Sequence, residues 1–222
     1  LYKTNNKLNL DDPIGITLAK EISLLKYIHP NIITISGLLI NFYIYKLLNS
    51  NNINIYLLII SLFYRWLADV MDGAVARAYD KVSKYGDWLD HTIDRLVDLS
   101  LLIAIGINTA WIDVHWLGWA AATLTLLGSY MGTQAQSVGL GRNYGGFSRA
   151  DRLVTTFVGI AIAAIMAFNG QSDVELPIVI SDTIGFDGIN PLSAVLLISL
   201  VGGIWTFLTR AMSSRRQLLD GE

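Results

Sequence analysis

The sequence has no cysteine, so disulfide bonds and thiolate metal sites are excluded, and any metal ion must be held by oxygen or imidazole ligands. Charged residues are also scarce: they make up 15% of the chain, whereas about a quarter is usual in a soluble domain. No run of lysine and arginine suggests nucleic acid as a partner. Because 53% of the residues are apolar and many stand in long runs, the composition predicts a membrane protein.

Six apolar runs have roughly the 20-residue length that a helix needs to cross a bilayer. We expect spans at about residues 32–48, 53–79, 85–107, 115–137, 150–168 and 191–211. Ahead of them, Ile14, Leu18, Ile22 and Leu25 recur at helical spacing within residues 12–27, which predicts an amphipathic helix on the membrane surface. The predicted fold class is therefore an all-α integral membrane protein with six transmembrane helices and an N-terminal amphipathic surface helix.

The basic residues predict the orientation of the chain, because lysine and arginine beside membrane spans stay cytoplasmic. They gather in the N-terminal segment, in the second-to-third and fourth-to-fifth connections, and in the tail. The opposite face has only Lys46 as a basic residue, and its last loop is acidic. We expect a cytoplasmic segment over residues 1–29, a membrane domain over 30–212 and a cytoplasmic tail over 213–222. Both termini would then be cytoplasmic, on the same side as the acidic segment discussed next.

Four aspartates lie on facing surfaces of the second and third predicted spans. Asp69 and Asp72 are three residues apart and share one helix face, and Asp90 and Asp94 are four apart and do the same on the next helix. A short bend brings the two faces together. Because unpaired carboxylates in a membrane span are costly, the cluster predicts one or two bound divalent cations. Oxygen ligands suit magnesium, manganese or calcium, and such an ion commonly binds phosphate groups in turn.

Small and basic residues accompany these aspartates. Gly73 and Ala76 leave the backbone beside Asp72 uncovered, so that a flat or bulky group such as a nucleotide can lie against it. Arg77 follows one turn later and can hold a phosphate with its forked guanidinium group. Gly86 opens the facing helix in the same way.

The pattern Asp69-x-x-Asp72-Gly73-x-x-Ala76-Arg77, then eight residues, then Gly86-x-x-x-Asp90-x-x-x-Asp94 resembles the signature of the CDP-alcohol phosphatidyltransferases. Every position of that signature is filled. The six spans and the sequence Pro30-Asn31-x-x-Thr34 are also similar to the family, so the resemblance covers residues 30–212.

The resemblance implies an enzyme of phospholipid biosynthesis with two bound divalent cations, Mg²⁺ or Mn²⁺. It assigns metal binding to Asp69, Asp72, Asp90 and Asp94, and makes Asp94 the general base that takes the proton of the acceptor hydroxyl. It also implies a membrane-embedded CDP-lipid donor of the diacylglycerol or archaeol type, the release of CMP, and a homodimer. The CDP pocket would be formed by Asp69, Gly73, Ala76, Arg77 and Gly86.

The acceptor is expected to be a small polar alcohol that carries a phosphate. The segments at residues 129–136 and 145–152 resemble the acceptor region of members that use phosphorylated inositol. Those members typically have basic residues where this chain has Gly132 and Gln134, so glycerol phosphate and inositol phosphate both remain candidates. Two or three arginines suit a phosphate, and we predict acceptor binding by Arg142, Arg149 and Arg152, whose alternative role is to set the topology.

Three alternatives remain open. The acceptor is serine or another alcohol without a phosphate, or the reaction joins a soluble CDP-alcohol to a lipid alcohol. A different class, a cation transporter with an acidic site inside the membrane, would also explain the aspartates. The transporter interpretation gives no reason for the spacing of Gly73, Ala76, Arg77 and Gly86.

Overall fold

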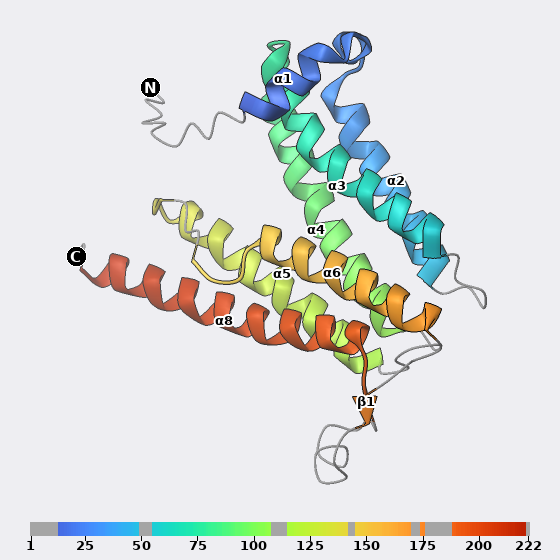
Figure 1. Ribbon diagram of the computed structural model, residues 1–222. Helices are drawn as coiled ribbons and strands as arrows, with labels where there is room; N and C mark the ends of the chain where they lie inside the picture. The colour runs from blue at the N-terminus through green and yellow to red at the C-terminus, as the bar shows by residue number, and fades with distance from the viewer. Residues whose placement is uncertain are drawn as a thin grey trace.

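The structure is a computed structural model that describes residues 13–48, 55–107, 115–141, 145–169, 174–175 and 188–220. Within these ranges the chain is helical, apart from an antiparallel pair of two-residue strands, β1 (Val174–Glu175) and β2 (Gly188–Ile189) (Figure 1). A short helix α1 (Pro13–Glu21) and a 3₁₀ turn η1 (Ser23–Tyr27) come first. The long helices are α2 (Pro30–Leu48), α3 (Ile55–Ala78), α4 (Lys84–Gly106), α5 (His115–Ser137), α6 (Arg149–Phe168) and α8 (Pro191–Leu219).

A helix stands at each of the six predicted spans, so the all-helical class is confirmed. The largest difference is at the last one, which was predicted to end at Ala211 and continues to Leu219. Among the described helices, α2 and α8 are long and apolar enough by composition to cross a membrane. The count of six spans and the orientation of the termini therefore stay predictions.

The long helices form two groups that meet where α4 packs against α5 (Figure 1). In one group α2 lies against α3 and α4, and in the other α8 lies against α5 and α6. The two groups cross closely at Gly106 and Gly118, where a Cβ atom on Gly106 would lie 2.6 Å from the Cα of Gly118. The absence of side chains at both positions is what lets the two backbones approach.

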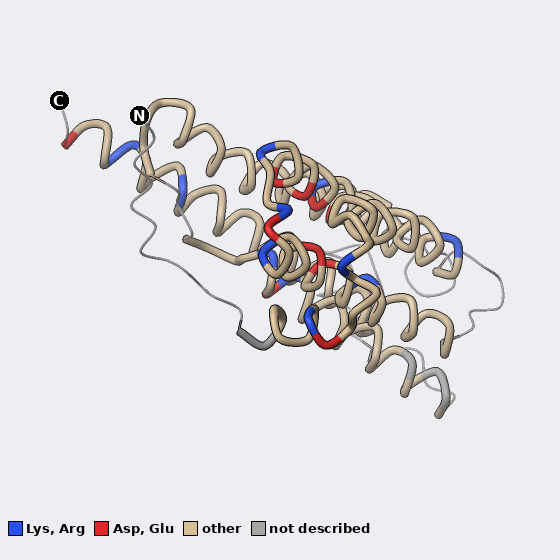
Figure 2. Tube along the Cα trace, turned by 90° about the horizontal axis from the view of Figure 1, so that it is seen from above, with Lys and Arg blue, Asp and Glu red and all other residues tan. Residues whose placement is uncertain are grey.

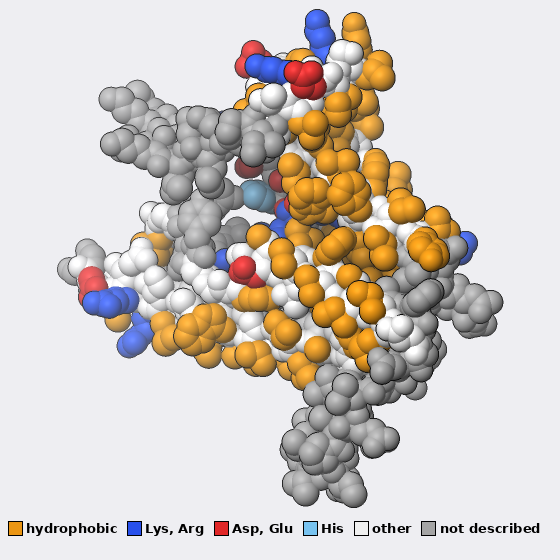
Figure 3. All heavy atoms as spheres, in the orientation of Figure 1, with side chains coloured by type: hydrophobic (Ala, Val, Ile, Leu, Met, Phe, Trp, Pro, Cys, Tyr) orange, Lys and Arg blue, Asp and Glu red, His pale blue; other side chains and the backbone are white. Residues whose placement is uncertain are grey.

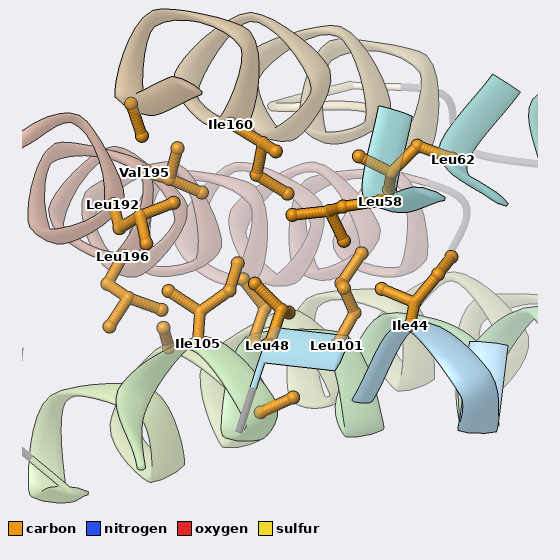
Figure 4. Packing of buried hydrophobic residues seen from close by; sticks show 14 of the residues in the cluster. Ile44, Leu48, Leu58, Leu62, Leu101, Ile105, Ile160, Leu192, Val195 and Leu196 are labelled. Carbon is orange, nitrogen blue, oxygen red and sulfur yellow. The ribbon is translucent and has the colours of Figure 1, made fainter. Parts of the chain in front are cut away.

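The main apolar core lies at one end of the long helices. It joins the end of α2 and the start of α3 to the end of α4 and the start of α8, with Ile160 of α6 between them (Figure 4). Because successive helices run in alternate directions, this is the end opposite the aspartates. The labelled core side chains are Ile44, Leu48, Leu58, Leu62, Leu101, Ile105, Ile160, Leu192, Val195 and Leu196.

The predicted amphipathic helix packs onto α3 near the aspartates. Ala19 is fully buried against Met71 and Val75, and the hydroxyl of Tyr79 donates a hydrogen bond to the carbonyl of Ala19 at 3.1 Å. The α-helix ends at Glu21, earlier than the predicted limit at residue 27, and η1 follows. Leu18 and Ile22, two members of the predicted apolar stripe, remain exposed. This leaves an apolar face available to a membrane surface.

Candidate active site

The signature aspartates gather where α3 ends and α4 begins. Seen from above, acidic and basic residues lie together near the middle of the helices (Figure 2). The space-filling view shows a hollow there, with acidic, basic and histidine side chains inside it (Figure 3). The long apolar helices therefore enclose a charged site between their two groups.

The bend between α3 and α4 is fixed by local hydrogen bonds. Lys81 N–H donates to the carbonyl of Ala76 at 2.8 Å and closes the end of α3, and Asp80 takes a positive φ of 52° at the turn. Ser83 caps α4, because its Oγ accepts a hydrogen bond from the N–H of Gly86 at 3.0 Å. These contacts set the spacing between the two pairs of aspartates.

Asp72 is held through both of its carboxylate oxygens. Its side chain accepts a hydrogen bond from Thr34 Oγ1 at 2.7 Å on one oxygen and from the N–H of Gly73 at 2.6 Å on the other. Asp72 is 6% exposed. Thr34 is the threonine of the Pro30-Asn31-x-x-Thr34 sequence, so that motif acts by orienting a signature carboxylate from α2.

Asp69 and Asp94 are joined by two arginines. Arg149 donates to Asp69 through Nη1 and Nη2, at 3.1 and 2.6 Å, and the same Nη2 lies 2.7 Å from Oδ1 of Asp94. Arg65 contacts Asp69 at 3.3 Å from one turn earlier in α3 and lies 3.8 Å from Asp94. Two of the four signature carboxylates thus pair with two guanidinium groups, and the remaining carboxylates leave an excess of negative charge for a cation to neutralise.

The start of α6 aims Arg149 at the aspartates. Ser148 and Asp151 cap the helix reciprocally: Ser148 N–H donates to Asp151 Oδ2 at 2.7 Å, and Asp151 N–H donates to Ser148 Oγ at 3.3 Å. The preceding residue, Phe147, donates its N–H to Thr206 Oγ1 of α8 at 2.8 Å. Anchored on both sides, the first residue of α6 extends across to α3 and α4.

The other predicted acceptor arginines lie elsewhere. Arg152 forms a buried ion pair with Asp98 at 2.6 Å and donates to the carbonyl of Phe147 at 3.3 Å, so it ties α6 to α4. Asp98 is 7% exposed, so the ion pair is shielded from solvent. Arg142 lies outside the described residues, as do five other charges used to predict topology: Lys3, Lys7, Asp173, Asp182 and Asp187.

Polar side chains lie close to the two glycines that were predicted to line the nucleotide pocket. The guanidinium of Arg77 lies over Gly73, with Nη1 3.1 Å from where a Cβ would stand. A Cβ on Gly86 would lie 3.2 Å from Oδ1 of Asn31, so the start of α2 closes that side. A larger residue at either glycine would press on side chains that border the pocket.

Asp90, His91 and Asp94 offer one ligand atom each within 4.8 Å of one another, a spacing that fits a metal ion. Asp94 Oδ1 is buried and, despite its closeness to Arg149, accepts no well-aligned hydrogen bond. Oxygen donors with one imidazole suit magnesium or manganese. His91 also lies 3.6 Å from Asp87, so its ring is placed between an exposed carboxylate and the cluster. The residues present fit a divalent cation.

A cavity of about 570 Å³ extends from this site between α2, α3, α4 and α6. Most of its lining is apolar, with Ile44, Leu62, Val97 and Phe157 among the side chains. Asp69, Arg65 and Arg149 line it as well, so the charged cluster and the apolar space are continuous.

Arg65 is the site residue that sequence reasoning missed. It is buried, contacts two signature aspartates and lines the cavity. A signal was present, since an arginine inside an apolar run, four residues before Asp69, has the spacing of a helical ion pair.

The sequence and the fold both match known proteins. Residues 27–208 match the sequence model of the CDP-alcohol phosphatidyltransferases, and the chain belongs to this family. Over 102 residues it is 38% identical to archaetidylinositol phosphate synthase of Pyrococcus horikoshii, an alignment that covers 44% of this chain and 51% of that protein. The chain spans about half the length of the curated relatives it matches.

Two solved structures of Mycobacterium tuberculosis phosphatidylinositol phosphate synthase (PgsA1) share the fold. The one with CDP-DAG bound has a TM-score of 0.67 at 20% identity and covers 91% of this chain and 94% of that chain. The one in complex with manganese and citrate has a TM-score of 0.65 at 21% identity and covers 91% and 87%.

Proposed function

We propose that this protein transfers a phosphatidyl-type group, diacylglycerol- or archaeol-based, from a CDP-lipid to the hydroxyl of a small phosphorylated alcohol. CMP is released, and the reaction serves phospholipid biosynthesis. One observation carries the proposal: the carboxylates of the family signature meet Arg149 at one end of an apolar cavity. A polar reaction centre beside apolar space suits a donor with a charged head and lipid tails.

The chemistry follows from the groups in the site. Asp69, Asp72, Asp90 and Asp94 would hold two divalent cations, Mg²⁺ or Mn²⁺, with His91 beside them. Bound cations supply neutralisation of the pyrophosphate and of the departing CMP. Asp94 accepts the proton of the acceptor hydroxyl, whose oxygen forms a bond to the lipid-bearing phosphorus while the bond from that phosphorus to CMP breaks.

The two ends of the donor would occupy different parts of the site. Gly73, Ala76, Arg77 and Gly86 would line the CDP moiety, with Asp69 between them and the cations. The lipid tails would lie along the cavity between α3 and α6, where apolar side chains predominate. The CDP-DAG named for the PgsA1 structure supports a donor of this class.

The acceptor is proposed to carry a phosphate. Inositol phosphate is favoured because the relatives are an archaetidylinositol phosphate synthase and a phosphatidylinositol phosphate synthase. Arg149 lies 2.7 Å from Asp94, the proposed base. A phosphate on the acceptor would bind this arginine while the hydroxyl lies near Asp94. Binding by Arg142 and Arg152 stays a prediction.

A panel assay tests the function. The purified protein is placed in liposomes with Mn²⁺ and a CDP-lipid, and inositol phosphate, glycerol phosphate or serine is added as the acceptor. In a separate reaction, a soluble CDP-alcohol is the donor and a lipid alcohol is the acceptor. The release of CMP is measured in each case. We expect CMP with a phosphorylated acceptor. Absence of CMP with every pair would remove the transferase proposal and leave cation transport to be tested. Arg149→Ala should raise the acceptor KM far more than the donor KM.

We also propose six spans with both termini and the active site cytoplasmic, and a homodimer. Because the chain lacks cysteine, single cysteines are unambiguous labels. In intact cells, an impermeant maleimide should label Ser50→Cys and spare Val82→Cys. The reverse labelling pattern would show that the chain has the opposite orientation. Light scattering in detergent should give twice the protomer mass, and the mass of one protomer would exclude the dimer.

A further inference from the structure

The Arg149 guanidinium occupies oxygens that the proposed metal site needs. A single nitrogen, Nη2, lies 2.6 Å from Asp69 Oδ1 and 2.7 Å from Asp94 Oδ1. The two carboxylates come from different helices, and this nitrogen bridges them. A divalent cation bound to both oxygens, at the usual distance of about 2.0–2.6 Å, would lie where Nη2 lies. The guanidinium and such an ion therefore exclude each other.

We propose that Arg149 is an exchangeable counter-cation, which cross-links Asp69 and Asp94 until a divalent cation displaces it and which then binds the phosphate of the acceptor. The last step rests on the proposed function, whereas the exchange itself does not. Arg149 would thereby connect the metal site to the acceptor site.

Arg149 is held in a way that permits release. Its side chain is 21% exposed, and its contacts with α3 and α4 are the two carboxylates. Its Nε is buried without a hydrogen-bond partner, so no further bond fixes the group in place. If the two carboxylates turn to a metal ion, the guanidinium loses what holds it.

Arg65 shares the unpartnered Nε but differs in its exposure and in what covers it. Its side chain is 6% exposed, and it pairs with Asp69 within the same helix turn. A Cβ on Gly37 would lie 3.5 Å from its Nη1, so α2 covers it. Its contacts with Asp69 and Asp94 are longer, at 3.3 and 3.8 Å, and leave room for a ligand. Arg65 is therefore the fixed cation of the site and Arg149 the exchangeable one.

The exchange has a consequence for the order of binding. While Arg149 pairs with two aspartates, its charge is unavailable to an anion. A divalent cation would therefore increase the affinity for a phosphate-bearing acceptor, and by linkage the acceptor would increase the affinity for the cation.

Arginine modification tests the exchange directly. The full chain in detergent is treated with phenylglyoxal, in chelator or with saturating Mn²⁺, and modification is followed by peptide mass spectrometry. We expect Arg149 to react about tenfold faster or more with Mn²⁺, in the range of typical site-to-site coupling. Arg216, whose side chain is 85% exposed, should react equally in both, and Arg65 in neither. Equal reactivity of Arg149 in both conditions, or absence of Mn²⁺ binding by electron paramagnetic resonance, would overturn the proposal.

A variant adds a second test, in which the affinity for Mn²⁺ should rise while the unfolding temperature in chelator should fall. Arg149→Gln should bind Mn²⁺ more tightly than the wild type, because no guanidinium competes, and should unfold at a lower temperature in chelator, because Asp69 and Asp94 lose their cross-link. Arg216→Gln, on the exposed tail of α8, should change neither quantity. Unchanged or weaker Mn²⁺ binding by Arg149→Gln would refute the exchange. Since neither experiment contains a lipid substrate, failure here is distinguishable from failure of the CMP-release assay.

Discussion

The hydroxyl of Thr34 donates a 2.7 Å hydrogen bond to Oδ2 of Asp72 and so connects the first turn of α2 to the signature in α3. The N–H of Gly73 already occupies the other carboxylate oxygen. With one donor on each oxygen, the plane of the Asp72 carboxylate is fixed before any ligand binds. A residue 38 positions away thus determines how a predicted metal ligand is presented.

Thr34→Val should weaken Mn²⁺ binding by about 10- to 100-fold, the usual effect of removing a hydrogen bond that orients a metal ligand. Valine keeps the shape of threonine and removes the donor. Titration of Mn²⁺ followed by electron paramagnetic resonance measures the change. Ser36→Ala is the matched control, because Ser36 lies on the same helix as Thr34 but its hydroxyl bonds to Ile33 of α2 and Tyr64 of α3 rather than to an aspartate. Equal affinities in Thr34→Val and the wild type would show that Asp72 needs no orientation.

Asp94→Asn should abolish CMP release while largely preserving the binding of the CDP-lipid. The amide has the same shape as the carboxylate but cannot take the acceptor's proton. Turnover and donor binding are measured in parallel, the latter by equilibrium binding of a labelled CDP-lipid. Turnover at the wild-type rate would remove Asp94 as the base, and loss of both quantities would make it primarily a binding residue.

Arg152→Met should destabilise the fold by about 3–5 kcal/mol, because it leaves the buried Asp98 carboxylate without its partner. Thermal unfolding in detergent measures the loss. The double variant Arg152→Met with Asp98→Leu should recover most of it, since neither charge then remains buried. Arg216→Met removes an exposed ion pair with Asp220 and should change stability little. If Arg152→Met is as stable as the wild type, the arginine has no structural role.

Gly106→Ala should destabilise the contact between α4 and α5 by about 1–3 kcal/mol, as other overpacked positions do. The added methyl group would lie 2.6 Å from the Cα of Gly118, which is backbone and cannot rotate away. Gly141→Ala is the control, because nothing lies within 4 Å of the Cβ position there. The comparison uses the midpoint of thermal unfolding, and equal midpoints would contradict the close crossing.

The sequence was sufficient to place the helices because each one combines an apolar run with a polar or proline boundary. The predicted span at residues 115–137 coincides with α5, and the signature indicated which ends of α3 and α4 face each other. The end of α8 was predicted too early, because its last two turns are polar and a hydropathy criterion stops at the last apolar residue.

The partners of the arginines were not predictable in the same way. Arg152 and Asp98 are 54 positions apart, and Arg149 and Asp69 are 80 apart. The spacing of residues within one helix therefore does not predict either pair. The sequence predicted the same role, acceptor binding, for all three arginines at residues 142–152. The fold distinguishes two of them, because successive turns of α6 direct Arg149 to the aspartates and Arg152 to the interior of the bundle.

The main apolar core packs the end of α2 and the start of α3 against the end of α4 and the start of α8, whereas the signature aspartates lie toward the other ends of α3 and α4. The contacts within this core involve apolar side chains and do not depend on the charged groups of the site. Because Ile44, Leu62 and Leu101 belong to this core and also line the cavity, the tails of the proposed donor would lie directly against the core.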